Sequence, residues 1–123
     1  MKIDSLIIFL ATRDLSRTAD FYEKTLRLPL ALDQGNCRVY RVASEGFIGF
    51  CEQKIPPPVE GVVITIVTEE VDEYCRLLRD RGVVFEKELI FNPQYKIYHC
   101  FLRDPNGYLV EIQRFDDPKW ATE

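Results

Sequence analysis

The sequence predicts an α+β fold made of two successive β-α-β-β-β modules. Two segments have the apolar spacing of amphipathic helices, and each follows one β-branched run and precedes three more. A shift of 56 residues carries Ile7 to Val63 and Thr12 to Thr68, so the order of elements repeats in register. We therefore expect module 1 at residues 1–54, a Pro-rich connector at 55–58, module 2 at 59–115 and a tail at 116–123.

The first module begins with the strand "KIDSLIIFL", after which Asp14 is expected to cap a helix. The strands "LPLALD", "CRVYRV" and "GFIGFCE" follow, separated by Gly35-Asn36 and Ser44-Glu45-Gly46, and predict an antiparallel meander. The inward helix positions are Leu15, Ala19, Tyr22 and Leu26.

The connector Ile55-Pro56-Pro57-Pro58 removes backbone donors and predicts an extended link. In the second module "GVVITIV" is a strand, and "TEEVDEYCRLLRDRG" is a helix that Gly82 ends. Its inward positions are Val71, Tyr74 or Cys75, and Leu78. "VVFEKELIF", "YKIYHCFL" and "GYLVEIQRF" are strands, with a tight turn at Asp104-Pro105-Asn106-Gly107.

Composition limits the class of protein. The 123 residues are 46% hydrophobic and 29% charged, as expected of a globular domain with a real core. No apolar run approaches the roughly 20 residues that span a bilayer, and no signal peptide is recognisable, so we expect a cytoplasmic protein without membrane contact. The net charge of -4, with scattered Lys and Arg, gives no footprint for nucleic acid.

The four cysteines, Cys37, Cys51, Cys75 and Cys100, contain no C-x-x-C pair. Without a secretory signal, this spacing predicts neither a disulfide framework nor a zinc knuckle. Because three of the four lie in apolar patterns, we expect small buried hydrophobes there.

The segments "TRDLSRTADFYEKTLRLPL" and "FLRDPNGYLVEIQ" resemble the vicinal oxygen chelate superfamily, which comprises glyoxalases, bleomycin resistance proteins and dioxygenases. The resemblance extends over residues 3–115. It implies curled mixed sheets, or half-barrels, with helices on the convex face and a ligand cavity on the concave face. It also implies a homodimer, with the cavity built within one chain or between two.

Glu111 is a carboxylate within an apolar strand, and a buried charge is costly unless it is paired or bound to metal. It matches the last-strand metal ligand of the superfamily. The other ligand positions would be Ile7, Val63 and Phe50, whose side chains have no lone pairs, so we expect no metal cofactor and an apolar lining instead. A divalent metal ion is the alternative, because a two-residue slip would bring Glu52 opposite Glu111.

Further candidates surround this strand. Gln113 is expected on the face of Glu111 because side chains alternate. His99, the only histidine, is a candidate general base or a structural residue, since its ordinary pKa lies near neutrality. Phe101 stands where the ring-cleaving dioxygenases carry a functional tyrosine, which disfavours that chemistry.

Arg38 and Tyr40 alternate in one strand and are expected to point to the same face. On the concave face they would bind an anionic or aromatic ligand; otherwise they are a solvated Arg and a core Tyr. Trp120 is expected to cover a cavity mouth or a dimer partner, or to lie in a loose terminus.

Two functions remain open. In the first, the protein binds a small molecule in a concave cavity without metal, like the bleomycin resistance proteins. In the second, it is a metal-dependent lyase, isomerase or dioxygenase that uses Glu111 as ligand or base, like glyoxalase I. The sequence does not decide whether the protein is an enzyme.

Overall fold

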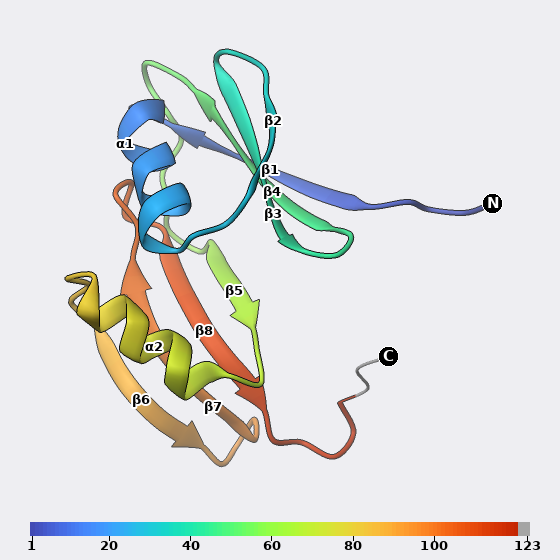
Figure 1. Ribbon diagram of the computed structural model, residues 1–123, viewed down its shortest axis with the longest axis vertical. Helices are drawn as coiled ribbons and strands as arrows, with labels where there is room; N and C mark the ends of the chain where they lie inside the picture. The colour runs from blue at the N-terminus through green and yellow to red at the C-terminus, as the bar shows by residue number, and fades with distance from the viewer. Residues whose placement is uncertain (121–123) are drawn as a thin grey trace. The chain divides into compact units, whose positions relative to one another are not determined.

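The computed structural model describes residues 1–120 and contains two compact units, Met1–Val59 and Glu60–Glu123 (Figure 1). Each unit holds a four-stranded mixed sheet with helical structure packed on one face. The α+β fold with two β-α-β-β-β modules is thus confirmed, whereas curling into half-barrels stays a prediction. The last three residues of the expected tail, 121–123, lie outside the described residues.

The N-terminal unit runs through β1 (Leu6–Thr12), α1 (Leu15–Asp20), the π-helical turn η1 (Phe21–Thr25), β2 (Leu30–Asp33), β3 (Cys37–Ala43) and β4 (Gly46–Glu52). The strand order is β1-β4-β3-β2, with β1 parallel to β4 and the other pairs antiparallel. The predicted meander is therefore β2, β3 and β4.

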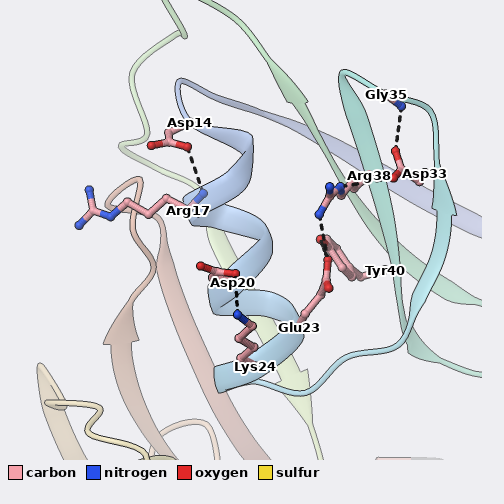
Figure 2. A network of polar contacts seen from close by, with 9 residues as sticks. All are labelled: Asp14, Arg17, Asp20, Glu23, Lys24, Asp33, Gly35, Arg38 and Tyr40. Atoms are coloured by element: carbon pink, nitrogen blue, oxygen red, sulfur yellow. Dashed lines mark hydrogen bonds and ion pairs between the residues drawn. The ribbon is translucent and has the colours of Figure 1, made fainter.

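The predicted start and inward face of the first helix are confirmed. Asp14 Oδ1 accepts a hydrogen bond from the backbone N–H of Arg17 at 3.0 Å (Figure 2). Glu52, at the end of β4, accepts another from the N–H of Leu15 at 3.0 Å, so strand and helix are joined where the helix begins. The four inward positions named above are all buried.

The C-terminal unit runs through β5 (Val63–Val67), α2 (Val71–Asp80), β6 (Lys87–Asn92), β7 (Ile97–Arg103) and β8 (Leu109–Phe115). Its strand order is β5-β8-β7-β6, with β5 parallel to β8 and the other pairs antiparallel. In this unit β8 is the strand between the first strand of the module and the hairpin partner β7 (Figure 1).

Helix α2 buries Val71, Cys75 and Leu78, which resolves the choice between Tyr74 and Cys75 in favour of Cys75. The helix ends as predicted at Gly82, whose φ of 88° is favourable for glycine. There the N–H of Gly82 donates to the carbonyl of Arg79, and the N–H of Val83 to that of Leu78, both at 3.0 Å.

The predicted turn between β7 and β8 is closed by Asp104. Its Oδ1 accepts from the backbone N–H groups of Asn106 and Tyr108, each at 2.9 Å, and its carbonyl accepts from Gly107 at 3.0 Å. Gly107 has a φ of 94°. These bonds set the register of β7 against β8, on which the site described below depends.

The expectation that the cysteines are only buried hydrophobes is wrong for two of them. Cys37 and Cys51 face each other across β3 and β4 and form a disulfide. Cys75 and Cys100 are buried free thiols, as expected. The sequence spacing did not reveal the bridge because the pairing arises from the register of two strands.

We predict that replacing both bridged cysteines, Cys37→Ser with Cys51→Ser, lowers the free energy of unfolding by about 2–3 kcal/mol, because the open loop regains entropy when unfolded. Denaturant unfolding of the variant and the wild type measures the difference. With a thiol reductant the two midpoints should converge. Equal midpoints without reductant would contradict the bridge.

Candidate functional site

The centre of the C-terminal sheet brings four polar side chains together on one face: Thr65, His99, Glu111 and Gln113. In the register of the sheet, Thr65 of β5 and Phe101 of β7 lie beside Glu111, and His99 lies beside Gln113. The opposite face is covered by α2, because Tyr98 of β7 donates to Asp72 of that helix at 3.1 Å. We call the face away from α2 the open face.

Glu111 is only 8% exposed, and its carboxylate accepts hydrogen bonds from neighbouring side chains in place of water. Thr65 Oγ1 donates to Oε1 at 2.8 Å, and His99 Nδ1 lies 2.6 Å from Oε2. With its amide nitrogen turned toward the carboxylate, Gln113 donates to the two oxygens at 3.2 and 2.9 Å. The buried charge is therefore satisfied by side chains of three strands.

The contact with Glu111 orients the imidazole of His99. Because a carboxylate only accepts hydrogen bonds, Nδ1 carries the proton, and in the neutral ring Nε2 is then an acceptor. No side chain within residues 1–120 is hydrogen-bonded to Nε2. Over the same residues, Arg38 Nε is the one fully buried side-chain nitrogen or oxygen without a hydrogen bond. His99 Nε2 also has no such bond, so it is not fully buried and reaches the molecular surface.

Apolar side chains surround this polar centre. Phe101 packs against the His99 ring, edge to face, with a centroid distance of 5.0 Å. Val63 and Val67 share the face of Thr65 and are 49% and 44% exposed, and Ile90, beside His99, is 57% exposed. A few convergent polar groups within an apolar surface are typical of small-molecule sites.

Thr65 was missed by the sequence analysis, which placed Val63 at this position. The strand pairing puts Val63 beside Leu109 and Thr65 beside Glu111. Thr65 lies two places further along the strand and so on the same face as Val63. The prediction therefore had the correct face of the strand but the wrong register against β8.

The structure places Phe50 away from the expected lining. Its ring is fully buried, 4.5 Å from that of Tyr22 on the helical side of the N-terminal sheet. The alignment of Gly46 with Gly107 was therefore wrong by an odd number of residues, which reverses the face. Ile7, 40% exposed, pairs with Phe47 on the other face of this sheet.

Arg38 and Tyr40 do share a face, as expected, but it is the one that packs against the helix. Tyr40 is buried and its hydroxyl donates to Glu23 Oε2 at 2.7 Å, while Arg38 lies 3.3 Å from the same oxygen (Figure 2). Burial, with help from Glu23, raises the pKa of Tyr40. The alternative named above was a core Tyr beside a solvated Arg; Tyr40 is such a core residue, whereas Arg38 is half-buried.

The donor set on the open face does not fit the metal of the superfamily. One imidazole and one carboxylate are present, and both oxygens of that carboxylate are already hydrogen-bonded. Across residues 1–120 no three His, Cys, Asp or Glu side chains are grouped so that they could hold a metal ion.

Within residues 1–120 no helix is long and apolar enough to cross a membrane.

Known proteins show which class this fold and site belong to. A family model for the Glyoxalase/Bleomycin resistance protein/Dioxygenase superfamily matches residues 2–112, so the chain belongs to that superfamily. Among curated proteins, none matches the sequence.

Solved structures of the same fold are distant in sequence. A glyoxalase/bleomycin resistance protein/dioxygenase from Nocardioides has a TM-score of 0.77 at 15% identity, covering 100% of this chain and 89% of its own. Lactoylglutathione lyase from Agrobacterium tumefaciens has 0.75 at 18%, covering 89% and 91%. A virulence protein from Salmonella typhimurium has 0.73 at 20%, covering 94% and 99%.

We predict that Glu111→Ala lowers the free energy of unfolding by about 1–3 kcal/mol, because the buried donors of His99 and Gln113, together with the hydroxyl of Thr65, lose their acceptor. Glu88→Ala is the control, since Glu88 forms an exposed ion pair with Arg79 that contributes at most about 1 kcal/mol. Denaturant unfolding measures both variants. Equal losses for the two would show that the carboxylate cluster contributes nothing particular.

Proposed function

We propose that the protein binds a small organic molecule on the open face of the C-terminal sheet, through His99 and Glu111 and without a metal ion. The observation that carries this proposal is the contact of 2.6 Å between His99 Nδ1 and Glu111 Oε2, which leaves Nε2 available. Membership of a superfamily named partly for bleomycin resistance supports a binding role.

The contacts of Glu111 indicate what kind of ligand fits. Both carboxylate oxygens already accept protein donors, so a cationic ligand group would have to displace them. His99 Nε2 has no such competitor and accepts a proton or hydrogen bond from the ligand, while Glu111 stabilises the imidazolium that results. An apolar ligand with an acidic hydroxyl, such as a phenol, an enol or a carboxylic acid, matches this site.

A second function, general-base catalysis, is favoured by the same geometry. An imidazole held by a carboxylate at Nδ1 presents Nε2 as a base for a substrate proton, and the carboxylate stabilises the charged ring. This mechanism needs His99 at the reacting atom, with Glu111 as its positioning residue. The two functions differ only in whether the bound molecule is converted.

The homodimer and the cytoplasmic location expected from the sequence stay predictions. Light scattering of the purified protein measures the first, and fractionation of the source cells the second.

We predict that a screen of phenols, enols and carboxylic acids yields a ligand that shifts the imidazole NMR signals of His99, which are unambiguous because the chain has one histidine. His99→Gln should weaken its binding at least about tenfold, a loss of about 1.4 kcal/mol. Tyr98→Phe is the matched control, because Tyr98 lies on the α2 side of the same strand.

Equal affinity of the two variants would place the ligand elsewhere and contradict the proposal. Conversion of the ligand by the wild type, lost in His99→Gln and retained in Tyr98→Phe, would identify the catalytic function. Binding without conversion would identify the binding function.

A further inference from the structure

The side of the C-terminal sheet opposite the proposed ligand site holds a pair of buried thiols. Cys75 of α2 and Cys100 of β7 are each 1% exposed, and their Sγ atoms lie 2.9 Å apart. Neither takes part in the binding or the catalysis proposed above. They are the two cysteines outside the disulfide of the N-terminal unit.

The separation of the two sulfurs is shorter than ordinary packing requires. Non-bonded carbon atoms prefer about 3.5–4.0 Å, and sulfur is larger than carbon. In a disulfide the sulfurs approach to about 2.05 Å. A small further approach of α2 and β7 would therefore bring Cys75 and Cys100 to bonding distance.

We propose that Cys75 and Cys100 are a reversible oxidation site, in which a peroxide converts the two thiols into a disulfide that joins α2 to β7. The inference rests on this thiol pair and is independent of the ligand site.

The two thiols have different parts in the reaction. The contact with the Cys100 sulfur, in which either thiol can be the donor, lowers the pKa of Cys75, and Arg79 lowers it further. The same contact raises the pKa of Cys100. Cys75 is thus the thiolate that attacks the peroxide, and Cys100 is the thiol that resolves the product.

The atoms balance in two steps. The Cys75 thiolate attacks one oxygen of hydrogen peroxide, the O–O bond breaks, and the leaving hydroxide takes a proton to become water, which leaves a sulfenic acid. The Cys100 sulfur, giving up its proton, then attacks the Cys75 sulfur and displaces the second oxygen, again as water. In total two thiols are oxidised to one disulfide and one peroxide is reduced to two waters.

The cross-link would lie directly behind the proposed ligand site. Cys100 follows His99 along β7, and its register partner Ile112 follows Glu111 along β8. Alternation puts the thiol on the α2 side and the imidazole on the open face of one strand. Oxidation therefore fastens the helix to the strand that carries His99.

We predict that peroxide removes two reactive thiols from the protein, measured after quenching and unfolding. The experiment uses the full chain carrying Cys37→Ser and Cys51→Ser, with peptide mapping of the wild type in parallel. The expected bond is Cys75–Cys100, reversed by a thiol reductant, with a thermal midpoint raised by at least about 5 °C.

Single variants test the order of events. Cys100→Ser should accumulate a sulfenic acid at Cys75, trapped by a cyclic 1,3-diketone, because the resolving thiol is absent. Cys75→Ser should accumulate far less at Cys100. Peroxide-treated wild type in which both thiols stay reactive, or in which they go to sulfinic acids without a bond, would overturn the proposal.

Discussion

The site depends on the pairing of β8 with a neighbour on each side. β8 pairs in parallel with β5 and antiparallel with β7, so Leu109, Glu111 and Gln113 each have a partner on both flanks. Glu111 is a stable residue there because Thr65 comes from one neighbour and His99 from the other. The bonds of Asp104 in the preceding turn maintain the second pairing. A change of register by one residue would turn Glu111 toward α2 and leave a charge in the apolar core.

The two modules share their topology but use their polar residues on opposite faces. In the N-terminal unit, Glu23 receives hydrogen bonds from Tyr40 and Arg38 on the helical side of the sheet, and Glu52 binds the start of α1. In the C-terminal unit the central acid lies on the side away from the helix. The acids of the first module therefore stabilise the attachment of its helix, whereas Glu111 orients a histidine. The duplicated order of elements did not carry the polar site with it.

Much of the fold could be predicted because it depends on local periodicity. The inward positions of both helices, the cap at Asp14, the stop at Gly82 and the turn at Asp104 are each determined by a few neighbouring residues. The face of Phe50, the bridge between Cys37 and Cys51, and the contact of Thr65 with Glu111 depend on which residue of one strand meets which of another. That information lies in long-range pairing, and an alignment of turn glycines does not contain it.

Strand β7 carries residues of both proposed sites, one on each face of the sheet. His99 points to the open face, and Cys100, the next residue, packs against Cys75 of α2. Alternation places the imidazole of the proposed ligand site and the thiol of the proposed oxidation site on opposite faces, although the two residues are adjacent in the chain. A disulfide formed on the α2 side, as proposed above, would therefore join the helix to the same strand that carries His99.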